Sequence, residues 1–587
     1  MKKPLLIICL LFAITGFSQQ TQEESFPYER EWGTYLPHIN VGNAITDFFT
    51  LSDNSLFFFS AAGFPFLDNL YPFPPDAEGN LTVGALNLEG QLDWVDKFRL
   101  GEETTSVYNI AIDEDDYIYF VGRTRDSLYI GTSGTYMPEY TPHSYNDTIY
   151  VGGQEVIGNF PGYAGFIAKY DTSGSQIWGT YVVGDKSIHN PNRLIKQGNY
   201  LYYYGQTNSK TGIATHGAYI STAPVSLPSE ITEVYNVSFL MKFDANTGER
   251  LWGTYMPLSA EQYTTEFIAF GTISVDNEGY AYWKNVNDYI KLNPDGTYHS
   301  LLSNPDNLNY YLELHFDSEG NIYTLARNKP NDNTNFGTAG TYKPNKTIDD
   351  EFVLVKLTPD FEKIWATYLG AVFYELSYSK LTINEEDNGE ILISSSAVSA
   401  DDITPDAFQT EYGGGDSDAV LMSFDMETGQ RKWFSYYGDS ETDIGHHITI
   451  ADEDSFYFTG TSYGGDNIVS GETLYAGEDF GGYFGWQSFP FVAKFVPRKP
   501  SSVEENQEVR FSVYPNPSSD QVYIEPINQW QDHLQIKIYT LQGKEVSVTA
   551  TQMARGYELD VSHLSAGVYV MKIDTGEAVV SYKLVKE

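Results

Sequence analysis

Cysteine is almost absent from this sequence. The single cysteine among its 587 residues is Cys9, which lies inside an apolar run at residues 5–14. Two lysines precede this run and small residues follow it, a pattern typical of a secretory signal peptide over residues 1–18. The mature chain then carries no thiol, which excludes a disulfide, a zinc site with cysteine ligands and a cysteine nucleophile.

Basic residues are also scarce. The chain has 35 Lys and Arg against 79 Asp and Glu, giving a formal net charge of -44. Proteins that bind nucleic acid neutralise phosphates with clustered Lys and Arg, so we expect no nucleic-acid partner and no docking on anionic lipid. Outside residues 5–14 no apolar run approaches the length of a membrane crossing. We therefore expect no transmembrane segment in the mature chain.

Aromatic residues and glycine are abundant, and they recur in repeats. The chain contains 46 Tyr, 35 Phe and 51 Gly, a composition that favours strands and turns over helices. The stretch FLMKFDANTGERLWGTY at residues 239–255 predicts an alternating apolar strand, a polar turn and a second strand. Related stretches begin at Phe166, Phe352 and Ala419. Such a period indicates a solenoid, a propeller or another repeat array.

Each full repeat contains four expected strands, which is the content of one propeller blade. They form an F-x-x-K-F strand, a W-G-T-Y strand and a hairpin with an acidic turn. Each group occurs seven times when variant copies are counted, including a copy of the W-G-T-Y strand near Tyr298 that lacks the tryptophan. The first W-G-T-Y, at 32–35, has no F-x-x-K-F before it, and the last F-x-x-K-F, at 491–495, has no W-G-T-Y after it. We therefore predict an all-β, seven-bladed propeller over residues 27–497, closed by pairing of these two terminal strands.

The runs DAFQTEYGGGDSDAVLMSFD from Asp406 and YFTGTS from Tyr457, together with W-G-T-Y, resemble the bacterial β-propeller repeat family of exported proteins. The resemblance implies a propeller and does not imply one activity. Insertions at 132–164 and 208–237 are rich in Pro, Gly, Ser, Thr and Tyr, and we expect loops there. Insertions in a repeat array usually gather on one face, often the binding face.

The repeat stops at a Pro/Ser/Glu-rich segment, residues 498–510, which we interpret as a linker. Residues 511–587 contain about seven short strand patterns, which predict a small Ig-like β-sandwich. This stretch resembles the type A C-terminal sorting domain of the Bacteroidetes type IX secretion system. The resemblance implies export through the outer membrane, the secretion machinery as a partner, and a protein secreted or attached to the cell surface. It is carried by motifs that include Tyr514, Pro515, Asn516, Pro517, Gly543, Gly567, Tyr569 and Lys583.

Several motifs suggest chemistry, but a structural interpretation is preferred for each. D-x-x-T-G-x-x-x-W, from Asp244 and Asp425, also resembles the tryptophan-docking repeats of quinoprotein dehydrogenases, where the motif is structural. Acidic turns such as 113–116 lack the spacing of calcium loops and suit solvated hairpin turns. Neighbouring His446 and His447 point to opposite faces of a strand, so we expect one packed and one exposed. We therefore predict no catalytic residue, no cofactor and no metal ligand.

Aromatic residues in the loops are the remaining candidates for a binding site. Tyr and Trp offer large rigid surfaces with a polar group, which suits stacking on sugars or contacts with proteins. We select Tyr412 and Trp486 as ligand-binding candidates from a wider set that also includes Tyr136, Tyr140, Tyr342 and Tyr483. The preferred hypothesis is an exported binding module for a polysaccharide or a surface protein. The alternative is a secreted carbohydrate-active enzyme with acidic residues converging on one propeller face.

Overall fold

A computed structural model divides the chain into two compact units, unit 1 at Met1–Pro497 and unit 2 at Arg498–Glu587. The predicted signal peptide (1–18) and the linker from residue 499 onward lie outside the described residues. Within those residues the regular structure consists of strands alone, so the prediction of an all-β fold is confirmed. The structure describes residues 26–36, 48–60, 81–98, 100, 105–141, 144–151, 154–161, 163–186, 188–224, 237–257, 273–285, 288–303, 313–327, 334–347, 351–373, 379–385, 389–400, 403–452, 455–464, 468, 489–498, 511–526, 534–540, 543–553, 556–574 and 579–587.

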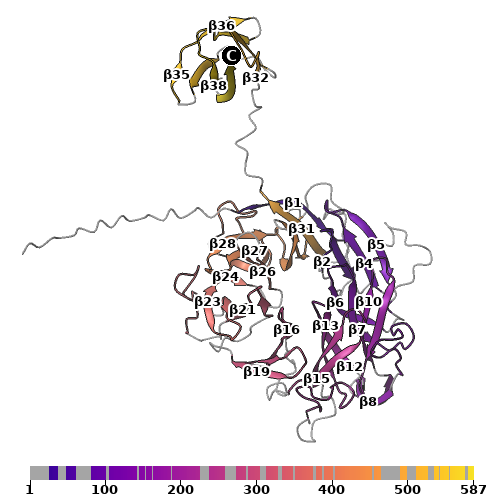
Figure 1. Ribbon diagram of the computed structural model, residues 1–587. Helices are drawn as coiled ribbons and strands as arrows, with labels where there is room; N and C mark the ends of the chain where they lie inside the picture. Colours follow the sequence, from indigo (N-terminus) through magenta and orange to yellow (C-terminus); the bar gives the residue numbers. More distant parts are fainter. Residues whose placement is uncertain are drawn as a thin grey trace, which may run out of the picture. The chain divides into compact units, whose positions relative to one another are not determined.

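The described part of unit 1 contains seven antiparallel sheets of four or five strands, which follow one another around a common centre (Figure 1). In the four-stranded sheets the first hairpin strand lies at one edge and the W-G-T-Y strand, or its counterpart, at the other. The strands are, sheet by sheet, β2 (Phe48–Thr50), β3 (Leu56–Ser60), β4 (Leu81–Leu86) and β5 (Leu92–Phe98); β6 (Ser106–Ile112), β7 (Ile118–Thr124), β10 (Ala164–Tyr170) and β11 (Gln176–Val182); β12 (Ile188–Gln197), β13 (Tyr200–Thr207), β14 (Val237–Asp244) and β15 (Arg250–Tyr255); β16 (Ile273–Val275), β17 (Ala281–Asn285), β18 (Asp288–Leu292) and β19 (Tyr298–Ser303); β20 (His315–Phe316), β21 (Ile322–Arg327), β22 (Phe352–Leu357) and β23 (Lys363–Tyr368); β24 (Ala371–Phe373), β25 (Lys380–Asn384), β26 (Glu390–Ala400), β27 (Asp418–Asp425) and β28 (Arg431–Tyr437); and β29 (Asp443–Asp452), β30 (Ser455–Ser462), β31 (Phe489–Pro497) and β1 (Tyr28–Tyr35).

One insertion contains more regular structure than expected. Residues 132–164 were predicted to be a loop, but β8 (Ser144–Val151) and β9 (Gln154–Pro161) form an antiparallel hairpin there. The sequence between the two strands is Gly-Gly, a pair suited to tight hairpin turns. Turn residues and local alternation therefore outweighed the loop-like composition of the insertion.

Apolar clusters join each sheet to the next. Phe57, on β3, and Phe166, on β10, belong to one such cluster, which links the first two sheets. Equivalent clusters link the following pairs, and the sheet that contains β1 shares clusters with both its neighbours. Strands such as β14 are buried on both faces because a neighbouring sheet covers each of them. This explains why the F-x-x-K-F strands are nearly continuous apolar runs.

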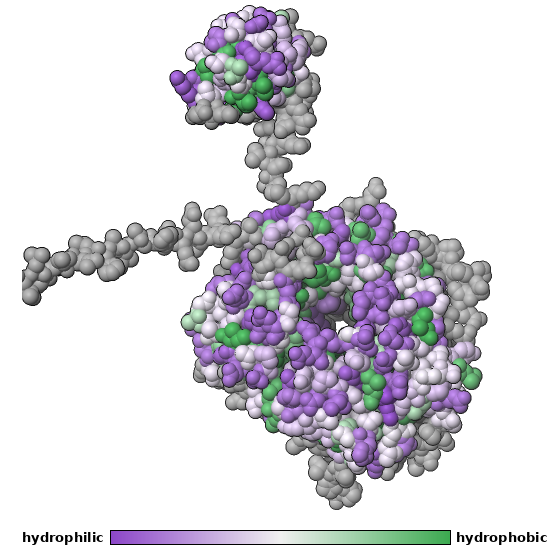
Figure 2. Space-filling model, viewed as in Figure 1, coloured by the Kyte–Doolittle hydropathy of each residue, from purple (hydrophilic) through white to green (hydrophobic). Residues whose placement is uncertain are grey.

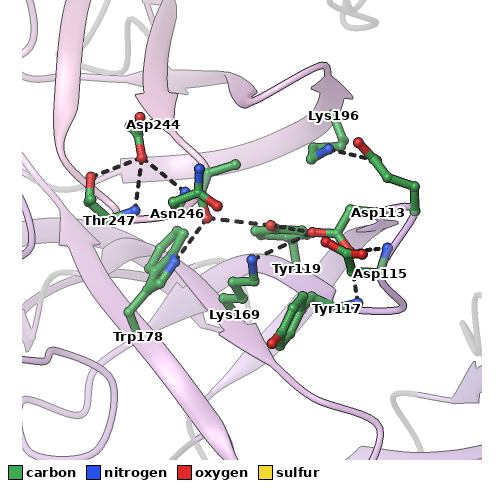
Figure 3. Close-up of polar contacts among 12 residues, drawn as sticks. Asp113, Asp115, Tyr117, Tyr119, Lys169, Trp178, Lys196, Asp244, Asn246 and Thr247 are labelled. Atoms are coloured by element: carbon green, nitrogen blue, oxygen red, sulfur yellow. Dashed lines mark hydrogen bonds and ion pairs between the residues drawn. The ribbon is translucent and has the colours of Figure 1, made fainter.

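A repeated polar joint also connects adjacent sheets (Figure 3). Asp244 accepts hydrogen bonds from the backbone N–H groups of Asn246 and Thr247, both at 2.9 Å, and so shapes the turn. The indole N–H of Trp178, in the neighbouring sheet, donates to the carbonyl oxygen of Ala245 in that turn at 3.0 Å. The tryptophan is therefore a docking residue between sheets, as the structural interpretation of this motif expected. Equivalent bonds run from Trp32 to Leu88, Trp252 to Pro294 and Trp365 to Met426.

The two terminal strands of unit 1 pair with each other. Strand β1 is antiparallel to β31, with Trp32 opposite Lys494 and Tyr35 opposite Phe491. The predicted pairing of 491–495 with 32–35 is therefore present. Phe26, one residue before the predicted start of the array, also packs here, with its ring 5.1 Å from that of Trp433. The sheet holding both ends thus belongs to the apolar core of the unit.

Unit 2 has two four-stranded antiparallel sheets among its described residues. They pack around a single apolar cluster that includes Ile524, Ile538 and Met571. The first sheet consists of β32 (Phe511–Tyr514), β33 (Gln521–Pro526), β37 (Gly556–Asp560) and β36 (Thr549–Met553), and the second of β35 (Glu545–Val546), β34 (Gln535–Thr540), β38 (Gly567–Asp574) and β39 (Val579–Lys586). Eight strands are present where about seven were expected.

Candidate functional site

The first strands of the sheets meet at the centre of unit 1. Contacts join β6 to β12, β12 to β16, β20 to β25, β25 to β29 and β29 to β2. Figure 2 shows a hollow in the middle of this unit, bordered largely by hydrophilic residues. Side chains carried by these strands are therefore candidates for a site that several sheets build together.

Equivalent positions on these central strands carry polar side chains. Arg193 pairs with Tyr204, directly before Gly205, and His447 pairs with Thr459, directly before Gly460. Lys380 on β25 pairs with Ser394 at the corresponding place in its sheet. Residues that are distant in sequence thus occupy equivalent register positions on the central strands. We call Arg193, Glu313, His315, Lys380, His446 and His447 the axial cluster.

Glu313 is the anion of the axial cluster. Its Oε1 atom lies 2.5 Å from a guanidinium nitrogen of Arg193 and 3.1 Å from Nζ of Lys380. Burial raises the pKa of Glu313, but the charges of Arg193 and Lys380 outweigh burial and hold it well below its usual range. Glu313 is therefore ionised at neutral pH. The three side chains remain 22–42% exposed, so a ligand can reach them.

The three histidines of the cluster are neutral at neutral pH. Burial lowers the pKa of His315, His446 and His447 to about 4, and the positive charge of Lys380 adds to this effect. Two of the rings contact threonine hydroxyls, with His447 Nδ1 3.1 Å from Thr449 Oγ1 and His446 Nε2 3.3 Å from Thr461 Oγ1. Each neutral imidazole has one N–H donor and one acceptor nitrogen.

The expectation that one of His446 and His447 is packed and the other exposed is wrong. Both are half-buried. A register shift between Gly445 and His447 places an extra residue in β29 opposite β30. Such a bulge interrupts the alternation of side chains between the two faces. Gly445 directly precedes the bulge, and a glycine inside a strand is the sequence signal that could have indicated it.

Two other carboxylates have raised pKa values, but they are not accessible. Burial, followed by the negative charge of Asp439, raises the pKa of Asp418 to about 6. Burial also raises the pKa of Asp443, to about 8. They lie close together, since an added Cβ at Gly438 would be 2.6 Å from Asp443 Oδ2 and 3.2 Å from Asp418 Oδ1. Both are 0% exposed, which keeps them out of reach of a substrate.

The aspartates of the acidic turns accept hydrogen bonds from groups of their own hairpins. Asp113 accepts hydrogen bonds from the backbone N–H groups of Asp115 and Tyr117 and from the hydroxyl of Tyr119. Asp276 and Asp317 make the same set of contacts in their own turns. Across the described residues, no group of three or more His, Cys, Asp or Glu side chains is placed to hold a metal ion.

Of the two predicted ligand-binding residues the structure describes Tyr412, which is not part of the axial cluster. Tyr412 is 36% exposed, its hydroxyl donates to the carbonyl oxygen of Gly415 at 2.9 Å, and its ring lies against Tyr436. Trp486 falls outside the described residues, as does Tyr483. The other loop aromatics are part of the packing: Tyr140 against Tyr181, and Tyr136 and Tyr342 beneath arginines.

Two of the motifs of unit 2, the Y-P-N-P corner and the last strand, meet at Asn516. Its side-chain amide donates to the carbonyl oxygen of Lys583 at 2.6 Å and its Oδ1 accepts from the N–H of Val585 at 2.8 Å. The Y-P-N-P corner is thereby tied to the last strand of the chain. Tyr514, Pro515 and Pro517 are exposed at this corner, Gly543 lies in the Thr540–Lys544 turn, Gly567 begins β38, and the buried Tyr569 donates to Ser565 O.

Residues 512–587 match the family model described as secretion system C-terminal sorting domain. Unit 2 is a sorting domain of this family. The domain directs the chain through type IX secretion to the exterior or the cell surface, as the C-terminal motifs predicted. In the part of the chain that the structure describes, no helix has the length and apolarity needed to cross a membrane.

Solved structures with some similarity to most of the chain have propeller-like folds. They include the quinohemoprotein alcohol dehydrogenase of Comamonas testosteroni, with 12% identity, coverage of 83% of this chain and 79% of that chain, and a TM-score of 0.36. The Pan2 WD40 domain of Neurospora crassa has 8% identity, coverage of 81% and 96%, and a TM-score of 0.38. Scores this low carry no argument about activity or cofactor. No curated protein matched the chain.

Proposed function

We propose that the chain is an exported binding module in which unit 1 is a seven-bladed β-propeller and the sorting domain is an Ig-like sandwich. Seven apolar clusters, each between two neighbouring sheets, support the propeller. The pairing of β1 with β31 supports closure of the ring. In this proposal residues 1–18 are the signal peptide, 27–497 the propeller, 498–510 the linker and 511–587 the sorting domain.

The state of Glu313 carries the proposal of binding without turnover. A general acid in glycoside hydrolysis needs a carboxyl whose pKa is raised toward the working pH. The pKa of Glu313, the accessible carboxylate of the axial cluster, is shifted in the opposite direction by Arg193 and Lys380. Such a group holds a charge and accepts hydrogen bonds, which suits recognition of a ligand. The partner is then a polysaccharide or a surface protein, in addition to the secretion machinery.

A carbohydrate-active enzyme is the second candidate. Its support is the raised pKa values of Asp418 and Asp443, the property expected of acidic catalysts. Their complete burial argues against this function, because a catalytic carboxyl must lie within hydrogen-bonding reach of its substrate. Tyr412 and Trp486 remain proposed contacts on the loop side of the propeller, with no catalytic role.

The test is a binding array of glycans and polysaccharides on the full mature chain, followed by analysis of the products of every ligand found. We expect retention of intact ligand and no change in its chain length. Turnover that is abolished by a single Asp or Glu substitution would contradict the binding proposal and favour the enzyme.

A further inference from the structure

The axial cluster carries a surplus of positive charge in a strongly acidic chain. Arg193 and Lys380 together meet one carboxylate, that of Glu313. The formal charge of the whole chain is -44, so a local excess of cations is unusual here. Surface charges farther away than about 10 Å are largely screened at 0.1 M salt. The local surplus therefore decides which ligand charge this site prefers.

The cations also have more hydrogen-bond donors than Glu313 can satisfy. A guanidinium has five N–H donors and an ammonium three, whereas a carboxylate accepts at about four positions. Both cations contact the same Oε1 atom, which concentrates their bonding on one side of the carboxylate. A second anionic group can therefore be accommodated without displacing Glu313.

The histidines complete this environment. His315, His446 and His447 belong to the same cluster and are neutral rings at neutral pH, so they add no charge that competes with an anion. Among the described residues, the charged groups that face them are Glu313, Arg193 and Lys380. Protonation of any of the three rings adds positive charge to the site.

We infer that the axial cluster binds a compact anionic group, a carboxylate or a sulfate, carried by the ligand of the binding module. This inference rests on the proposed binding function and specifies its ligand class. Arg193 and Lys380 supply the charge-assisted donors, and Glu313 is the internal anion that competes for them.

Two substitutions of opposite effect test the inference. Calorimetry measures the binding of glucuronate, inorganic sulfate and neutral glucose to the full mature chain. Lys380→Gln removes one charge-assisted donor, so we expect binding of glucuronate and sulfate to weaken about tenfold or more. Glu313→Gln removes the competing anion, so we expect their binding to tighten. Lys196→Gln is the matched control, because Lys196 lies on the same strand as Arg193 and pairs instead with Glu114 at 3.1 Å.

Binding of glucuronate and sulfate that is as tight in K380Q as in the parent chain, or that weakens equally in K196Q, would place the anion elsewhere and overturn the inference. Equal binding of glucose and glucuronate, unaffected by either change, would overturn it while leaving the binding module intact. Melting curves show whether each variant remains folded. For a variant that unfolds, Lys380→Arg keeps the charge, and restoration of binding by this change supports the inference.

Imidazole signals in NMR titrations provide a second measurement. A bound anion stabilises the protonated rings, so sulfate should raise the pKa of His447 from its low value near 4. Binding should therefore tighten as the pH falls from 7 toward 4. An unchanged histidine titration at saturating sulfate would place the anion elsewhere and contradict the inference.

Discussion

At the scale of single residues, the joint between sheets depends on a glycine lying against a tryptophan. Gly296 has a φ of +82°, and an added Cβ would lie 2.6 Å from Cδ2 of Trp252. Gly90, Gly248 and Gly429 meet the tryptophans of their neighbouring sheets in the same way. The repeat thus requires glycine for packing between sheets as well as for its backbone conformation.

Replacement of Gly296 by Ala should destabilise unit 1 more than replacement of Gly217. Both positions have nearly equal positive φ, +82° and +85°, but nothing lies within 4 Å of a Cβ added at Gly217. Both variants bear the left-handed backbone cost of about 1–2 kcal/mol. Only G296A must also displace Trp252, so its melting temperature should be the lower of the two. Equal melting temperatures would show that the indole moves without cost.

The buried pair Asp418 and Asp443 should make stability fall as the pH rises. The folded pKa of Asp443, about 8, lies above its ordinary value of 3.8, so its favourable contribution is complete below about pH 4 and is lost as the pH rises through 8. We expect Asp443→Asn to raise the melting temperature at pH 9 and to change it little at pH 4. The control is Asp416→Asn, an exposed residue of the same region. Because the pKa of Asp418 is also raised, part of the pH dependence should remain in D443N; a pH dependence equal to that of the parent chain would contradict the assignment.

At the scale of elements, the strands were largely predictable and the axial cluster was not. Apolar residues and turn glycines marked β14, β15 and the closing strands. The apolar runs of strands such as β14 are nearly continuous because neighbouring sheets cover both faces. Glu313, Lys380 and Arg193 belong to different repeats, and no local pattern relates them. The bulge at His446 changes the direction of one side chain by an insertion into the ladder. Only the three-dimensional arrangement of the first strands brings these groups together.

A disulfide between β1 and β31 should stabilise unit 1. Thr34 and Val492 are direct partners across these strands. Thr34→Cys with Val492→Cys links the two ends of the unit, and the only native cysteine, Cys9, lies in the predicted signal peptide. Closing a longer loop stabilises more, about 3 kcal/mol for 15 residues and 4.7 for 100 in the chain-entropy model.

The matched control for this disulfide is the pair Leu240 and Thr254, which are partners at the equivalent place within one sheet. The crosslink between these two residues closes only a short hairpin. Under oxidising conditions we expect the larger rise in melting temperature for the Thr34–Val492 crosslink. The same rise for both would indicate that the terminal pairing does not limit unfolding.

At the scale of the whole molecule, folding and export belong to different units. Residues 512–587 carry the sorting domain, while unit 1 has its own apolar clusters and its own strand closure. We expect deletion of residues 512–587 to leave a folded, protease-resistant unit 1 in the periplasm, because the shortened chain lacks the signal for crossing the outer membrane. Cell fractionation and limited proteolysis measure both properties. Normal amounts of the shortened protein in the medium would contradict the role of the sorting domain.

The pairing of β1 with β31 also has a consequence for biosynthesis. Strand β1 emerges first from the ribosome, whereas its partner at Phe489–Pro497 is among the last parts of unit 1 to be made. The edge of β1 therefore waits, unpaired and prone to aggregation, through nearly the whole synthesis of the unit. The sorting domain, residues 512–587, is made after that partner strand. A chain that terminates before β31 lacks both its closing strand and its sorting domain. Such a chain can neither close unit 1 nor be exported.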